Sequence, residues 1–496
     1  MAADGTVLGL YGNGTAFDSA RRRAEAVVVT RLVGQSGDVA TAGYESAGRL
    51  SSTSYPSGAG NGGNATSGAF AYDASSGQPS SITWSGPGGT LTTDVVARNL
   101  GGDIVDETVD GTDPTPGGPS SVYDAAGRLI SAVLAERDPA TGVPTGATRT
   151  LGYQYAPSGG CGSAPNAGAN TNRTGLTVNG ATAAAYCYDN ADRLTSTTAV
   201  GYTGPISYDA HGNTVTVAGE ARVYDSADRH ISTVKGSSTV AYVRDATDRI
   251  VQRSANGAVT ARYVYSGDGD VADAVVDANG NIVESYLGLP GGVTLTARPA
   301  GSQWAYPNLR GDTAAVADAA GAKQGPTGTF DPFGQPVTTA ADLTTGGLGY
   351  GFLGSKQRPT ETNPNLVGTV EMGARQYDPT LGRFLQTDSV DGGLDTNDYA
   401  YVRDPINQFD LNGQGWCTLG HNPKHGRRHG GCRGGRVARA AGHVVRGARN
   451  TARSGCWFGR RHGRRSCKGA HGFETLNAWG LTVVFSAAFG GACNAA

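Results

Sequence analysis

The sequence YDNADRLTSTT, residues 188–198, contains the pattern that decides the fold of this chain. It begins with Tyr-Asp, continues through small residues to an arginine, and ends in an alternating segment. An aspartate in this position can bond to the backbone of a tight turn, and the alternation is typical of a half-buried strand. The segment therefore predicts a turn followed by a β-strand.

The same pattern recurs along the chain. Clear copies begin at Tyr123, Tyr188, Tyr208 and Tyr224, and degenerate copies begin at Tyr44, Tyr72, Tyr242 and Asp277. Between Tyr188 and Tyr242 the copies follow one another at steps of 20, 16 and 18 residues, which suits two short strands and their turns. A single unit cannot bury its apolar face alone, so the units must stack. We expect an all-β fold in which the tyrosines pack inside the wall of a continuous hairpin strip.

The composition agrees with a turn-rich β-protein. The chain has 496 residues, of which 78 are glycine, and only 17% of its residues are charged. The glycines lie among regularly placed tyrosines, threonines and valines, which favours sheets and turns over disorder. Segments 107–119 and 156–172 are interpreted as surface loops, and Cys161 and Cys187 could link the ends of the second.

The net charge of −2 hides a strong asymmetry. Residues 415–496 contain 14 Lys and Arg and one acid, Glu474, a net charge of +13. The preceding 414 residues contain 26 basic and 41 acidic residues, a net charge of −15. This contrast indicates that the basic C-terminal segment is a separate part of the molecule.

Five cysteines lie in the basic segment, which favours an oxidising destination or a metal site. A zinc site could use Cys417, Cys432 and two of His421, His425 and His429, but the spacing matches no common zinc finger. Disulfides are the preferred interpretation, for example Cys456 with Cys467, and no cofactor or metal is expected. Neither a signal peptide nor a run of about 18 apolar residues is recognised, and we expect the chain to begin inside a longer gene product.

The sequence changes character at Phe330. It continues with FDPFGQ (330–335), GARQYDPTLGRFLQTD (373–388), NDYAYVRDP (397–405) and DLNG (410–413), and it is preceded by YPNLRGDT (306–313). Together with the upstream Tyr-Asp units, these motifs resemble the YD-repeat, or RHS, family of polymorphic toxins and its repeat-associated core domain. The resemblance covers roughly residues 40–414.

The resemblance implies a strip of hairpins that curls into a shell, a core domain that plugs one end, and a variable C-terminal segment held inside as cargo. It also implies self-cleavage by an aspartate pair assisted by an arginine. Motif by motif, these correspond to Asp388, Asp410 and Arg375, and the expected cut is between Gln414 and Gly415. Two close carboxylates can supply a general acid and a general base, which makes the chemistry reasonable.

This chain departs from the family pattern near the expected cut. Ser389 follows Asp388 where the family usually has proline. The junction reads Asp-Leu-Asn-Gly-Gln where the family usually has Asp-Pro-x-Gly-Leu. The alternative is that both aspartates only stabilise turns.

The basic segment permits three interpretations. Its cation density favours an effector that acts on nucleic acid, with His421, His425 and His429 as candidate acid–base residues. Its basic and apolar halves also fit a membrane-active peptide, and the third interpretation is a cargo without activity. No recognised nuclease motif decides among them.

The sequence therefore predicts three regions: a partial YD-repeat shell over 1–329, a core domain over 330–414, and basic cargo over 415–496. The predicted function is storage and delivery of that cargo in bacterial competition, from a secreted or cell-surface location. The expected partners are the chain's own C-terminal segment, an immunity protein, and a preceding shell portion or partner chain. The alternative is a cell-surface or wall-associated protein whose repeats bind carbohydrate.

Overall fold

The computed structural model describes residues 9–12, 29–34, 37–156, 161–164, 166–267, 269–341, 343, 346–389, 396–415, 417–418, 475–478 and 481–484. The chain forms two compact units, residues 1–433 and 434–496. The described residues form strands and three short 3-10 turns, and none of them lies in an α-helix. The all-β prediction is confirmed, whereas the predicted boundaries at 329/330 and 414/415 remain predictions.

The first unit contains three consecutive antiparallel sheets, each with its strands in sequence order. The first sheet has eight strands: β1 (Gly9–Gly12), β2 (Val29–Gly34), β3 (Gly37–Tyr44), β4 (Leu50–Tyr55), β5 (Thr66–Tyr72), β6 (Pro79–Gly86), β7 (Gly89–Arg98) and β8 (Ile104–Val109). The second has six: β9 (Ser121–Tyr123), β10 (Leu129–Arg137), β11 (Pro144–Gln154), β12 (Gly175–Val178), β13 (Ala181–Tyr188) and β14 (Leu194–Thr197).

The third sheet has thirteen strands: β15 (Ser207–Tyr208), β16 (Thr214–Val217), β17 (Glu220–Tyr224), β18 (His230–Lys235), β19 (Ser238–Arg244), β20 (Ile250–Ala255), β21 (Ala258–Val264), β22 (Ala274–Val276), β23 (Ile282–Gly288), β24 (Thr294–Ala297), β25 (Gln303–Pro307), β26 (Thr313–Ala317) and β27 (Lys323–Gln324). Smaller sheets follow: β28 (Thr329–Phe330) with β29 (Pro336–Thr338), then β30 (Leu348–Gly349), β31 (Thr360–Glu361), β32 (Val370–Met372), β33 (Arg375–Asp378) and β34 (Arg383–Phe384), and β35 (Gln408–Phe409) with β36 (Cys417–Thr418).

Each Tyr-Asp unit makes the turn between two strands of the strip. In the turn from β17 to β18, Asp225 Oδ1 accepts the N–H groups of Ala227 (2.9 Å) and Arg229 (3.1 Å), and Asp225 Oδ2 accepts Arg229 Nε (2.7 Å). The same set of bonds recurs at Asp124, Asp189 and Asp245. The aspartate thus satisfies the turn backbone and orients the arginine, which explains why Tyr-Asp and Arg occur at this spacing.

The tyrosine hydroxyl of one unit donates to a backbone carbonyl of the preceding hairpin. Examples are Tyr224 to Thr214 (3.0 Å) and Tyr265 to Ile250 (2.8 Å). Tyr123 donates to Ile104 (2.8 Å) and Tyr208 to Leu194 (3.0 Å), across the two places where one sheet ends and the next begins. The tyrosines therefore pack in the wall, as predicted, and also connect the separate sheets.

The two ends of the strip pack face to face. Buried residues of β2–β7 form one apolar core with buried residues of β24–β26 and the turn before them. Trp84 Nε1 donates to the carbonyl of Pro307 at 2.8 Å, and Tyr306 Oη bonds with Thr66 Oγ1 at 2.7 Å. The strip thus returns on itself within the first unit.

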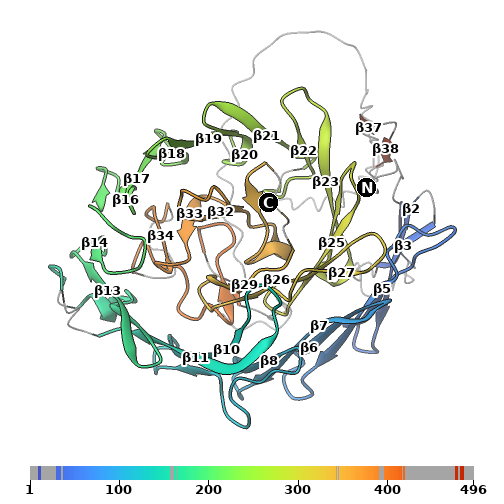
Figure 1. The fold of residues 1–496 in the computed structure, drawn as a ribbon, viewed down its shortest axis with the longest axis horizontal. Helices are drawn as coiled ribbons and strands as arrows, with labels where there is room; N and C mark the ends of the chain where they lie inside the picture. Colours follow the sequence, from blue (N-terminus) through green and yellow to red (C-terminus); the bar gives the residue numbers. More distant parts are fainter. Residues whose placement is uncertain are drawn as a thin grey trace, which may run out of the picture. The chain divides into compact units, whose positions relative to one another are not determined.

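The segment after β27 lies on the inner face of the strip. Figure 1 shows β32–β34 (orange) surrounded by the strands of the three large sheets. Phe333 joins the core of the second sheet, and Leu381 and Leu385 join the core near β13 and β14. The described residues of 330–414, called the filling below, therefore pack against the inner face of the three large sheets, called the wall.

The prediction of a surface loop over residues 156–172 is partly wrong. A disulfide joins Cys161 and Cys187, as the sequence suggested. However, Ala164 and Ala167 are buried in the core with Leu194, and Ala167 begins a 3-10 turn, η1 (Ala167–Asn170), that precedes β12. Backbone bonds hold the segment at the core, because the N–H groups of Ser163 and Ala164 donate to the carbonyl of Tyr188 at 3.0 and 3.1 Å.

The described part of the second unit consists of β37 (Thr475–Ala478) and β38 (Leu481–Val484), which pair antiparallel. The predicted residues His421, His425 and His429 and the cysteine side chains of the basic segment lie outside the described residues. Nowhere in the described chain is there a helix long and apolar enough to cross a membrane.

Replacing Tyr208 by Phe should lower the free energy of unfolding by about 1 kcal/mol, because the carbonyl of Leu194 loses its donor at a break between sheets. Tyr263→Phe is the matched control, because the buried Tyr263 hydroxyl has no hydrogen-bond partner among the described residues. Denaturant unfolding measures both. Equal losses would contradict a connecting role for the Tyr208 hydroxyl.

Candidate functional site

A tight hairpin presents the predicted arginine. Strands β32 and β33 pair with Met372 opposite Arg375, which leaves Gly373 and Ala374 as a two-residue turn. The Arg375 guanidinium lies over the ring of Phe384, 3.7 Å from its centroid, and Nη1 donates to the carbonyl of Asp398 at 2.7 Å. The ring contact and this hydrogen bond together hold the guanidinium in one orientation.

The structure brings together the three side chains that the sequence singled out. Arg375 Nη2 lies 3.2 Å from Asp388 Oδ2 and 3.2 Å from Asp410 Oδ2. The side chain of Asp388 is 14% exposed and that of Asp410 is 3% exposed. One guanidinium nitrogen thus faces a carboxylate with access to solvent and a carboxylate without it.

Burial sets the protonation of this group. Burial raises the pKa of Asp410, Arg375 opposes the shift, and the nearby Asp388 charge adds to it. Burial also lowers the pKa of Arg375, against the influence of the two aspartates. Asp410 is therefore placed to retain a proton.

The predicted junction lies directly beside Asp410. Asp410 Oδ1 accepts the N–H of Gly415 at 3.3 Å. The Gln414 N–H donates to Asn412 Oδ1 at 3.2 Å, and Gln414 Nε2 donates to Ser389 Oγ at 3.2 Å. Asp410 therefore stabilises the local turn, as the alternative interpretation proposed, and faces Arg375 at the same time.

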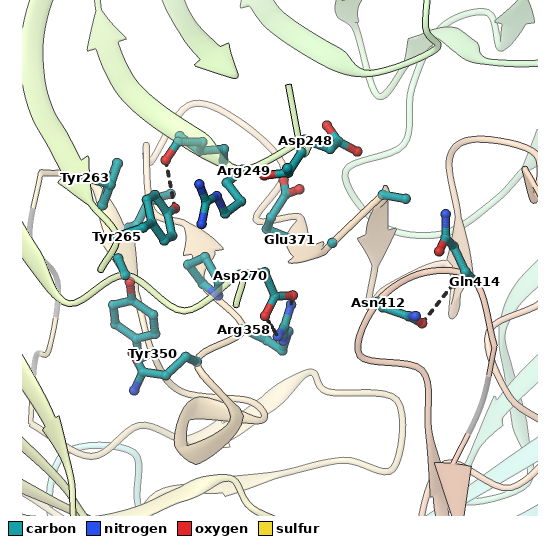
Figure 2. Close-up of a pocket in the computed structure, with 18 residues that line it drawn as sticks. Asp248, Arg249, Tyr263, Tyr265, Asp270, Tyr350, Arg358, Glu371, Asn412 and Gln414 are labelled. Atoms are coloured by element: carbon teal, nitrogen blue, oxygen red, sulfur yellow. Dashed lines mark hydrogen bonds and ion pairs between the residues drawn. The ribbon is translucent and has the colours of Figure 1, made fainter. Parts of the chain in front are cut away.

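A cavity of about 220 Å³ opens beside the junction. Asn412 and Gln414 border one side, and Asp248, Tyr263 and Tyr350 are among the residues that line the rest (Figure 2). Burial raises the pKa of Asp248 to about 7, with Arg244 opposing and Glu371 adding to the shift. The cavity leaves room for water beside the junction.

Ion pairs fix the filling to the wall around this cavity. Arg244 on β19 binds both carboxylate oxygens of Glu371 on β32, each at 2.9 Å. Arg253 binds Glu361 at 2.9 and 2.6 Å, and Arg358 binds Asp270 at 2.6 and 2.9 Å. Because Glu371 belongs to the hairpin that carries Arg375, the first pair also fixes the site.

Other contacts of the site escaped the sequence analysis. Asn412 and the turn residue Gly373 were not singled out, although an Asn-Gly pair and a glycine two residues before an arginine both favour tight turns. The long-range pair Arg244–Glu371 left no local signal. Within the described part of the chain, no group of three or more His, Cys, Asp or Glu side chains is arranged to hold a metal ion.

Comparison with solved structures identifies the same fold in larger chains. The crystal structure of TcdB2-TccC3 matches with a TM-score of 0.53 and 15% identity, over 78% of this chain and 20% of that one. The crystal structure of TcdB2-TccC3-TEV matches with a TM-score of 0.50 and 15% identity, over 78% of this chain and 21% of that one. The Photorhabdus luminescens Tc holotoxin pore with the mutation TccC3-D651A gives a TM-score of 0.49 and 14% identity, over 82% of this chain and 21% of that one.

This chain thus spans about a fifth of the length of the solved chains that it matches. No family model and no curated protein matches its sequence. At this identity the likeness shows a shared fold, that of part of the TcdB2-TccC3 chain.

Removing the arginine should expose the repulsion between the two carboxylates. At pH 8, Arg375→Ala is expected to be less stable than Arg375→Ala/Asp410→Asn by about 3 kcal/mol, because the single variant leaves uncompensated buried charge. At pH 5 the difference in stability between the two variants should be smaller. The raised pKa of Asp410 lets this carboxyl take up a proton, which removes the charge that Arg375 no longer compensates. Denaturant unfolding at both pH values tests this, and a gap independent of pH would contradict it.

Proposed function

We propose that residues 1–414 form an RHS-type shell that stores and delivers the basic C-terminal segment 415–496, which self-cleavage between Gln414 and Gly415 releases. The observation that carries the proposal is the contact of Arg375 with both Asp388 and Asp410, while Asp410 accepts the N–H of Gly415. The fold likeness to TcdB2-TccC3 supports the shell.

The geometry suggests a division of roles between the carboxyls. Asp388, the more exposed, takes a proton from water as the water oxygen bonds to the Gln414 carbonyl carbon. Asp410, whose pKa burial raises, gives its proton to the Gly415 nitrogen as the Gln414–Gly415 bond breaks. Arg375 stabilises the carboxylate left behind.

Water also needs a way to the scissile carbonyl. Gln414 is exposed and borders the cavity beside the hairpin, so its peptide is accessible without opening the wall. The departures from the family pattern also fit together here, because Ser389 and Gln414 are hydrogen-bonded to each other. The junction is thus held by a local set of contacts of its own.

The alternative function, carbohydrate binding through exposed aromatic grooves, receives no such support. Among the described residues of the first unit, the aromatic side chains are buried or half-buried. Most of them pack against one another or donate to the backbone, as Tyr224 does to Thr214.

Purified chain should separate on a denaturing gel into fragments 1–414 and 415–496, whereas Asp388→Asn and Asp410→Asn should remain intact. Mass spectrometry should identify Gly415 as the new N-terminus. Cleavage should slow as the pH rises through the raised pKa of Asp410, because the proposed acid then loses its proton. Asp225→Asn is the matched control, since the Asp225 carboxylate bonds within the β17–β18 turn, to the Ala227 and Arg229 N–H groups and to Arg229 Nε. A wild-type chain that stays intact over days would contradict the cleavage.

We further propose that the released segment acts on nucleic acid, given its 14 Lys and Arg against one acid. Cleaved protein incubated with RNA and DNA should shorten one of them, and the activity should fall at least tenfold in a variant with His421, His425 and His429 replaced by Ala. Leakage of anionic vesicles without nucleic-acid loss would instead indicate the membrane-active interpretation. The absence of both nucleic-acid loss and vesicle leakage would indicate a cargo without activity.

A further inference from the structure

Two glycines meet where the hairpin turn contacts the junction. Gly373, in the β32–β33 turn, has a φ of +63°, and a Cβ at this position would lie 2.8 Å from the carbonyl oxygen of Asn412 and 2.9 Å from its Cα. Both distances are too short for carbon against backbone. The junction backbone can therefore approach the turn this closely only because residue 373 has no side chain.

The second glycine has the reciprocal arrangement. Gly413 is buried and has a φ of +66°, and a Cβ there would lie 2.6 Å from the carbonyl oxygen of Met372 and 3.0 Å from the nitrogen of Arg375. Each glycine thus makes space for the backbone of the opposite segment. The contact thus involves the backbone of Arg375, which supplies the guanidinium, and of Asn412, two residues before Gln414.

Backbone and side-chain bonds fix the contact. The Ala374 N–H donates to the carbonyl of Asn412 at 3.1 Å, and Asn412 Oδ1 accepts the N–H of Gln414. On the other side of the turn, Gln386 donates to the carbonyl of Ala374 at 3.3 Å and accepts the N–H of Gln376 at 2.8 Å. Gln386 lies two residues before Asp388, so the same turn is tied to both aspartate-bearing segments.

From this geometry we propose that Gly373 and Gly413 form a clasp that positions the Gln414–Gly415 peptide against Asp388 and Asp410, an inference that rests on the proposed self-cleavage. They are positioning residues, because neither supplies a reacting group: Gly373 holds the Asn412 backbone, and the Gly413 N–H bonds to the Asp410 carboxyl. A side chain on either would push the junction away from the hairpin, and displacements of about 1 Å can cost a hundredfold in rate. The clasp sets where the chain is cut.

The test compares glycine variants of the full chain that carry the same backbone strain. Gly413→Ala and Gly373→Ala should slow the appearance of fragment 415–496 at least tenfold. Gly111→Ala is the matched control: Gly111 has a φ of +73°, and a Cβ there would meet nothing within 4 Å. It should lose similar stability in thermal unfolding and cleave at the wild-type rate. Cleavage of the Gly413→Ala variant at the wild-type rate would overturn the inference.

A second measurement does not depend on cleavage. In an Asp388→Asn background, hydrogen exchange at the Ala374 amide should be faster with Gly413→Ala than with Gly111→Ala, because its acceptor, the Asn412 carbonyl, lies across the contact and moves away with the junction. Unchanged exchange would refute the clasp even if the wild-type chain cleaves. An intact wild-type chain with altered exchange would instead refute the self-cleavage and leave the clasp as a feature of the fold.

Discussion

The packing of the wall depends on hydrogen bonds from tyrosine hydroxyls to backbone carbonyls of the preceding hairpin. Units such as those at Tyr123, Tyr208 and Tyr224 place a tyrosine at the end of one strand, and its O–H donates to a carbonyl of the hairpin before it. The following aspartate supports the turn, and its arginine often stacks on the next aromatic ring, as Arg249 does on Tyr265 at 4.5 Å. Every hairpin is therefore oriented by its neighbours, which lets a strip of short strands curve as a unit.

On the inner face of the wall, ion pairs determine the position of the filling. Arginines of the wall form buried, bidentate ion pairs with glutamates of the filling, and Arg253 with Glu361 is the most buried of these pairs. Such pairs add little net stability compared with apolar packing, but they tolerate few alternative arrangements. They therefore determine how the filling sits in the strip, and through Glu371 they determine where Arg375 lies.

The repeating part of this architecture was readable from the sequence because each unit carries its own turn chemistry. The Tyr-Asp copies predicted the strands, and motif matching predicted the convergence of Arg375 with Asp388 and Asp410. The wall-to-filling pairs were not predictable, since Arg244 and Glu371 are 127 positions apart and neither lies in a distinctive motif. The buried alanines after Cys161 were also missed, because small residues in a glycine-rich stretch look the same in a loop and in a core.

The meeting of the first sheet with β24–β26 has a consequence for biosynthesis. Trp84 and its neighbours leave the ribosome well before Trp304 and Tyr306, which are their partners in the apolar core. At a synthesis rate of roughly 5–20 residues per second, this separation corresponds to a delay on the order of 10–40 s. During that interval the nascent strands present an uncovered aromatic surface and free edges, which favour aggregation until the partner strands have been made.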